Sequence, residues 1–367
     1  MKKSLIALAV LAASGAAMAQ SSVTLYGVAD AFIGSTETEL SASTTTPVIA
    51  ATGQRQNAVS SSGVNGSRWG LKGSEDLGGG MKAIFTLESG FNLDTGAAAS
   101  STSLFNRQAF VGLQSGFGTV SLGRQYSAYY ALQTATNHNY DAATFNASIP
   151  VFANGLKDYS LRVDNSIAYT SPSFSGFSGA VVYGFGENKN APATTTPAFA
   201  GNVNGDATDN VSVHLKYANG PILVGYAYQQ EKLARVGTVQ DDNKYNMVAG
   251  SYDFGVAKLT GSYNTAKNNT FDDKEYQVGV SVPFGAAAIS AGYARSKSEG
   301  ASVERTGKGY SVLATYDLSK RTRLYAGAQN TEAYIPTAAT ATAVAAPLNA
   351  VGKTEITTYG IGVRHAF

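Results

Sequence analysis

The strongest constraint on how this chain can fold is a two-residue period in its apolar side chains, which is clearest in Lys353–Phe367. One face of that stretch is mostly apolar or aromatic, and the other carries small, polar or charged side chains. This period indicates a β-strand, because successive side chains of a strand point to opposite faces of the sheet. The stretch Ser22–Ile33 alternates in the same way. If the two pair, the sheet closes and keeps no unpaired edge.

The same alternation recurs along the chain in the runs 211–217, 257–263, 276–284 and 310–318. Their polar faces are rich in small and hydroxylated side chains, as the wet interior of a barrel would be. A soluble sandwich is the alternative fold, but it needs a second apolar set of strands to cover the first. The opposite faces are too hydrophilic for that. Tyrosines and phenylalanines crowd the strand ends, which is typical of the two aromatic belts of a membrane protein.

Short and long connections alternate between these runs. Seven are short and rich in Gly, Pro or Ser, as tight turns require: 75–80, 115–118, 173–176, 219–221, 253–255, 284–286 and 319–321. Eight are mostly longer: about 36–62, 95–103, 126–159, 188–208, 234–240, 268–273, 300–306 and 336–351. Fifteen connections join sixteen strands. We therefore expect an all-β fold, a closed antiparallel 16-stranded transmembrane barrel with short turns at one end and long loops at the other.

The first residues are typical of an export signal. Lys2 and Lys3 precede a short apolar run, and Ala17-Met18-Ala19 is an A-x-A cleavage site, so we expect a signal peptide at 1–19 and a mature chain starting at Gln20. The mature chain, 20–367, is expected to be one barrel domain. After the signal, no run of about 18 apolar residues predicts a membrane-spanning helix.

Charge and cysteine content narrow the function classes. The chain has 27 basic and 25 acidic side chains, and removal of Lys2 and Lys3 would leave the two numbers equal. A nucleic-acid partner is therefore not expected. The chain has no Cys, and its three histidines, His138, His214 and His365, lie far apart without a metal-binding spacing. We expect no metal, no cofactor and no enzymatic activity.

Several motifs together resemble the Gram-negative general porins, in their betaproteobacterial branch. They are the runs Ser67–Phe85, Arg107–Leu113, Gly118–Tyr126 and Asp164–Pro172, and the final Phe367. The resemblance covers essentially the whole mature chain. It implies a sixteen-stranded barrel in the outer membrane, surrounded by outer-membrane lipids, and a homotrimer. It also implies a third extracellular loop, here about Tyr126–Tyr159, that folds inward as a constriction, and a Phe367 that the barrel assembly machinery recognises.

Alternation predicts which charged side chains face the water inside such a barrel. Arg68 and Lys72 share one face opposite Trp69, and Lys82 and Glu88 share one face opposite Phe85 and Leu87. Arg162 shares its face with Ser166 and opposes Ile167. Candidate pore-lining residues are thus Arg68, Lys72, Lys82, Glu88 and Arg162, with the loop acids Asp141 and Asp158.

Arg124 falls within the motif that resembles the porin constriction, but its parity is that of Val120 and Leu122. Either a bulge near Gly123 reverses the alternation, or Arg124 lies above the apolar band. Both alternatives stay open from the residues alone, and the resemblance implies that Arg124 is a further residue of the constriction.

These features predict a general diffusion porin with a modest anion preference, since basic wall groups face a loop with few acids. Small hydrophilic solutes would cross passively through a water-filled barrel. The alternatives are a solute-selective channel, and a structural or adhesive barrel whose loops bind other surfaces.

Overall fold

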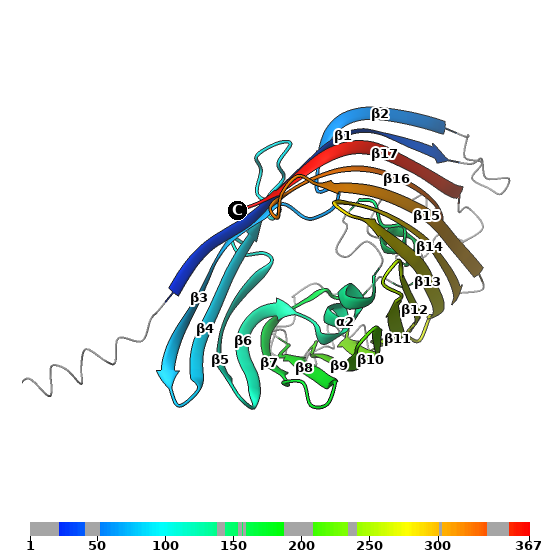
Figure 1. Ribbon diagram of the computed structural model, residues 1–367. Coiled ribbons are helices and arrows are strands. Elements are labelled where there is room, and N and C mark those ends of the chain that lie inside the picture. The colour runs from blue at the N-terminus through cyan, green and yellow to red at the C-terminus, as the bar shows by residue number, and fades with distance from the viewer. Residues whose placement is uncertain are drawn as a thin grey trace, which may run out of the picture.

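The computed structural model describes residues 22–40, 52–137, 144–152, 156, 159–186, 208–233, 241–300, 303–335 and 352–367. The strands form one antiparallel sheet that curves round and closes (Figure 1). Their bounds are β1 Ser22–Leu40, β2 Thr52–Ser61, β3 Arg68–Gly78, β4 Met81–Gly90, β5 Gln108–Ser115, β6 Gly118–Tyr126, β7 Arg162–Thr170, β8 Phe177–Gly184, β9 Asn210–Asn219, β10 Ile222–Lys232, β11 Asp242–Asp253, β12 Lys258–Lys267, β13 Phe271–Phe284, β14 Ala287–Gly300, β15 Val303–Asp317, β16 Thr322–Ile335 and β17 Gly352–Ala366. Two helices, α2 Ala128–Thr136 and α3 Ser148–Phe152, lie between β6 and β7.

The barrel closes where β1 meets β17, as the alternation of the two stretches predicts. The pairing runs from Val28 opposite Ala366 to Leu40 opposite Thr354. Backbone hydrogen bonds of 3.0 and 3.1 Å join Gly27 to Phe367 beyond the last ladder pair. The closed antiparallel barrel is thereby confirmed.

The seventeen described strand segments make sixteen barrel positions, because β2 and β3 pair with successive parts of one strand. β2 lies along Ala31–Leu40, and β3 lies along Ser22–Val28. Residues 62–67 separate β2 from β3 at this barrel position. The connection expected at 36–62 is therefore too long, since most of it pairs as strand.

The seven short connections are confirmed, and all lie at one end of the barrel, which we call the turn end. Gly220 and Gly285 have φ of 56° and 65°, a left-handed conformation that tight turns assign to glycine. At the other end, the loop end, two connections are shorter than the sequence indicates, because β13 begins at Phe271 and β15 begins at Val303. The signal peptide expected at 1–19 lies outside the described residues.

The two faces of the wall differ as expected. Large apolar side chains such as Leu25, Ile33 and Ile361 are exposed on the outer face, while polar side chains such as Asp30, Ser212 and Gln229 are buried on the inner face. Among the described residues, no helix has the length and apolar character needed to cross a membrane.

The apolar core lies inside the barrel, where the chain between β6 and β7 packs against the wall. Figure 1 shows α2 within the ring of strands. Its Tyr129 and Leu132 pack with Ala227, Tyr245 and Met247 of β10 and β11. At α3, Val151 and Phe152 pack on Ala294 of β14. We call the described residues of this stretch, 126–137, 144–152, 156 and 159, the inward segment.

Glycines on the inner wall allow this close packing. At Gly225 a Cβ atom would lie 2.7 Å from Leu132, and at Gly327 it would lie 2.4 Å from the ring of Phe145. The inner wall is therefore not uniformly wet. Small residues of β10–β16 leave the space in which the inward segment packs against the wall.

Candidate functional site

A cluster of charged and phenolic groups on the inner wall is centred on Glu88 of β4. The Glu88 side chain is about 5% exposed. Its Oε1 accepts a hydrogen bond from Arg107 Nε at 2.7 Å, and its Oε2 accepts one from Tyr26 Oη at 3.0 Å. Arg68 Nε lies 3.4 Å from the same Oε2. One carboxylate thus holds two guanidinium groups.

Tyr126 extends the cluster toward the inward segment. Its hydroxyl oxygen accepts hydrogen bonds from Arg107 Nη2 at 2.8 Å and from Arg162 Nη2 at 3.1 Å. The Arg162 guanidinium also lies over the Tyr126 ring, 4.7 Å from its centroid, which is a cation–π contact. The ring of Tyr126 is 4.8 Å from that of Tyr130 in α2. The cluster therefore contacts the base of the inward segment.

The alternation of β1, β3 and β4 builds most of this site. Tyr26, Gly70 and Glu88 lie opposite one another in register, so they share the inner face. A Cβ atom on Gly70 would lie 2.9 Å from Tyr26 Oη, so a glycine here leaves room for the Tyr26 ring. Lys72 follows Gly70 by two residues on β3, and its Nζ lies 5.1 Å from the centroid of the Tyr26 ring.

The cluster carries more positive than negative charge. Arg68 and Arg107 pair with the one carboxylate, Glu88, while Lys72 lies over the ring of Tyr26 and Arg162 lies over that of Tyr126. Arg162 makes no ion pair with any described residue, and its Nε is buried without a hydrogen-bond partner. A surplus of fixed cations beside a narrow aqueous space attracts anions.

The structure brings together Arg68, Lys72, Glu88 and Arg162 of the residues that the sequence singles out. Lys82 lies on the face of Glu88 but at the turn end, paired in register with Asp76 and Gln114, and is exposed. Asp141 and Asp158 lie outside the described residues.

Arg124 lies apart from the Glu88 cluster. A register shift does occur between Gly123 and Gln125, but the extra residue is on β7, where Asn165 has φ of 47°. Gln125 stays on the face of Ser121, from which it accepts a hydrogen bond at 2.5 Å. Arg124 accordingly keeps the parity of Leu122 and pairs with Asp164, whose side chain is 66% exposed.

The same bulge changes the argument for Arg162. The sequence predicts its orientation from an unbroken alternation through Asp164 to Ser166, which the bulge interrupts. Val163 consequently turns inward and is buried against Ala128 and Ala168. Arg162 reaches the cluster through Tyr126 at the strand end instead.

Sequence reasoning misses Tyr26, Arg107 and Tyr126 as members of the site. Arg107 opens the motif Arg107–Leu113, but it precedes β5, so alternation does not orient it. Its backbone N–H donates to Glu88 O at 3.2 Å, which places its side chain beside that carboxylate.

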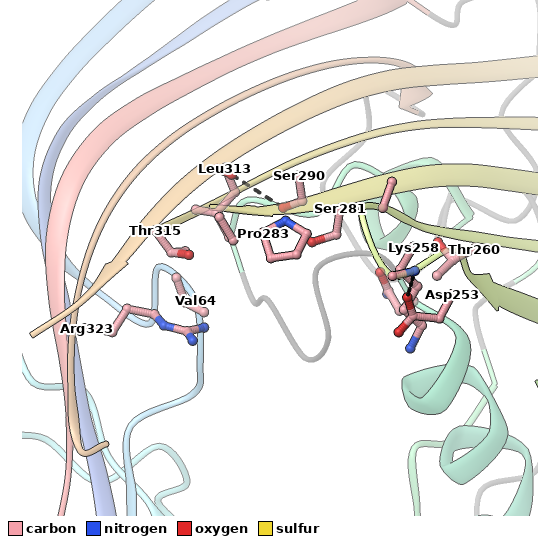
Figure 2. A pocket seen from close by; sticks show the side chains of 14 residues that line it. Val64, Asp253, Lys258, Thr260, Ser281, Pro283, Ser290, Leu313, Thr315 and Arg323 are labelled. Carbon is pink, nitrogen blue, oxygen red and sulfur yellow. Dashed lines mark hydrogen bonds between the residues drawn. The ribbon is translucent and has the colours of Figure 1, made fainter. Parts of the chain in front are cut away.

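A cavity of about 240 Å³ lies elsewhere on the inner wall, between β11 and β16 (Figure 2). Hydroxyl groups of Thr260, Ser281, Ser290 and Thr315 line it. Arg323 also lines it, and its guanidinium donates two hydrogen bonds to Asp317, at 2.6 and 2.9 Å. Asp253 and Lys258 lie at its edge on the β11–β12 side, and small or apolar residues such as Ala288 and Leu313 make up much of the rest, so the lining is mainly uncharged, unlike the Glu88 cluster.

Comparison with known proteins identifies the family. Residues 5–334 match the model of the Gram-negative porin family. The chain belongs to the Gram-negative porin family. An outer membrane porin protein of Bordetella pertussis is 34% identical over 410 residues, covering 100% of both chains. Outer membrane porin protein 32 of Delftia acidovorans is 35% identical over 89% of this chain and 88% of its own.

A solved structure gives the same fold. The anion-selective porin from Comamonas acidovorans is 27% identical, with a TM-score of 0.75 over 95% of this chain and 100% of that chain. Like these relatives, this chain spans the outer membrane with its strands, and it serves as a channel for passive diffusion of small hydrophilic solutes. The family is not a class of enzymes.

Proposed function

We propose that this porin prefers small anions, and that the inward segment narrows its channel beside the Glu88 cluster. The observation that carries this proposal is the excess of fixed cations: Arg68, Lys72, Arg107 and Arg162 against the one carboxylate of Glu88. Lys82 and the loop acids Asp141 and Asp158 complete the proposed pore lining. The similar porin from Comamonas acidovorans is described as anion-selective.

The physical basis is the electric field across a small aqueous space. Low-dielectric walls concentrate the field of fixed charges, so an anion is stabilised and a cation is repelled on the way through. Arg124 contributes less in this proposal, because its pairing with Asp164 offsets its charge. The channel itself makes and breaks no bond.

We also propose that the porin acts as a homotrimer in contact with outer-membrane lipids, and that the barrel assembly machinery inserts it. One protein of the same fold, OmpT of Vibrio cholerae, is described in a trimer form. Cross-linking of the purified protein would report the number of chains in the assembly.

The test is the reversal potential of the wild type and of Arg162→Ala in a planar bilayer under a salt gradient. A unit charge about 8 Å from an ion in water contributes about 0.5 kcal/mol, with opposite sign for an anion and a cation, so the variant should lose about fivefold in the anion-to-cation permeability ratio. A wild-type channel that selects cations would contradict the proposal.

The cavity in Figure 2 favours a second candidate, a channel that prefers hydroxylated solutes. Liposome swelling with neutral sugars of rising size separates the two. A smooth fall of the rate with solute size supports general diffusion, and one sugar that swells the liposomes out of order supports solute preference.

A further inference from the structure

Asp30 of β1 is a fully buried carboxylate that the Glu88 cluster does not use. Its Oδ1 accepts hydrogen bonds from Gly63 N at 2.9 Å and from Tyr325 Oη at 2.6 Å. Its Oδ2 accepts hydrogen bonds from Val64 N at 3.1 Å and from Asn65 N at 2.8 Å. Four donors satisfy the two oxygens, which explains how the charge can be buried.

These bonds fix the 62–67 segment, where the strand position shared by β2 and β3 is interrupted. The hydroxyl of Ser67 donates to Asp30 O at 3.1 Å, and Ser62 N donates to the same oxygen at 2.9 Å. Arg364 Nε donates to Asn65 Oδ1 at 2.6 Å from the neighbouring wall. The 62–67 segment is thus held by β1, β16 and β17 in one conformation.

The 62–67 segment in turn holds the inward segment. Gly63 O accepts backbone hydrogen bonds from Thr144 N at 3.3 Å and from Phe145 N at 3.4 Å. Ser62 O accepts a hydrogen bond from Thr144 Oγ1 at 2.9 Å. The carbonyl groups that accept these bonds belong to Ser62 and Gly63, whose own backbone N–H groups donate to Asp30.

Packing seats the same part of the inward segment. Phe145 is fully buried, with its ring 5.2 Å from that of Phe32 and 6.1 Å from that of Tyr325. Gly327 lies beneath it, and any Cβ there would overlap the ring. Tyr325 therefore links the hydrogen bonds of Asp30 to the packing of Phe145, since its hydroxyl donates to Asp30 and its ring borders Phe145.

We propose that Asp30 is a positioning residue that sets the width of the channel. It holds the 62–67 segment, and that segment holds the inward segment at Thr144 and Phe145. This inference rests on the proposed narrowing of the channel by the inward segment. Asp30 does not touch the solute.

Asp30→Asn is the informative substitution. An amide has one acceptor oxygen, so its NH₂ group would face two N–H or O–H donors that now bind a carboxylate oxygen. Loss of a hydrogen bond to a buried charge should raise the fraction of channels with an undocked inward segment by about tenfold or more. Glu332→Gln is the matched control, because it removes the same charge from a group that pairs with Lys308 and Lys353 and not with the 62–67 segment.

The readouts are open-channel current noise and the size limit for neutral sugars in liposome swelling, on full-length refolded protein. Asp30→Asn should raise the noise and admit larger sugars than the wild type, whereas Glu332→Gln should match the wild type in both. A wild type that conducts, with Asp30→Asn equal to Glu332→Gln, overturns the inference alone. A wild type that forms no channel overturns the proposed function instead.

Two further variants decide the question if Asp30→Asn does not assemble. Thr144→Val removes the hydrogen bond to Ser62 O without changing charge or shape much, and Gly327→Ala displaces the Phe145 ring. Both should raise the noise and the size limit. Wild-type values for both variants would overturn the inference.

Discussion

Individual side chains of this porin act through the face on which they lie. Glu88 is buried on the inner face of the wall, among guanidinium groups. Glu332 shares the outer face with Leu324, and it pairs with Lys308 and Lys353 at 3.3 and 2.6 Å. Both are single carboxylates between basic groups. Only Glu88 is expected to influence the ions that pass.

Glu88→Gln should therefore increase the anion preference. Removal of this charge leaves four basic side chains uncompensated, and a unit charge about 8 Å from the ion shifts anion and cation in opposite directions, which changes the permeability ratio about fivefold. Reversal potentials of folded channels measure the effect. Glu332→Gln is the control and should leave the ratio unchanged; an equal change in both variants would refute the assignment of Glu88 to the pore.

The closure of the barrel depends on the small size of one residue, Gly27. A Cβ atom there would lie 2.3 Å from Phe367 Cζ and 2.7 Å from Arg68 O. Gly27→Ala should cost about 1–3 kcal/mol through overpacking, visible as a lower urea midpoint of unfolding. At Gly53 nothing lies within 4 Å of the added atom, so Gly53→Ala should not lower the midpoint.

At the scale of elements, α2 depends on the wall rather than on its own sequence. Ser127 caps it by accepting a hydrogen bond from Tyr130 N, and Ser212 of β9 accepts one from Tyr129 N at 2.9 Å. His214 Nδ1 lies 2.7 Å from Ala128 O. Nine residues are too few for a stable isolated helix, so docking on the wall maintains it.

Leu132→Ala should therefore loosen the helix and leave the barrel intact. Leu132 is fully buried over Gly225, and truncation of such a side chain costs about 2–5 kcal/mol. We expect unchanged electrophoretic mobility of the folded barrel and a larger size limit in liposome swelling. Ala131→Ser, on the exposed side of α2, should change neither. A size limit that Leu132→Ala does not alter would show that α2 has no part in narrowing the channel.

For the whole molecule, the selectivity arises from the summed field and should depend on salt. The Debye length falls from about 10 Å at 0.1 M to about 3 Å at 1 M, so the wall charges are screened from the permeating ion. The anion-to-cation permeability ratio should decline toward unity over this range. A ratio that does not change with salt would indicate filtering by size alone.

The sequence by itself determined the barrel, because alternation and turn chemistry are local properties that each strand carries independently. It also determined the inner face of Arg68, Lys72 and Glu88, whose strands run without a bulge at those positions. Only the tertiary structure decided the membership of Arg107, Tyr26 and Tyr126 in the cluster and the separation of Arg124 from it. Those outcomes depend on register between strands and on the Asn165 bulge, which two-residue periodicity does not encode.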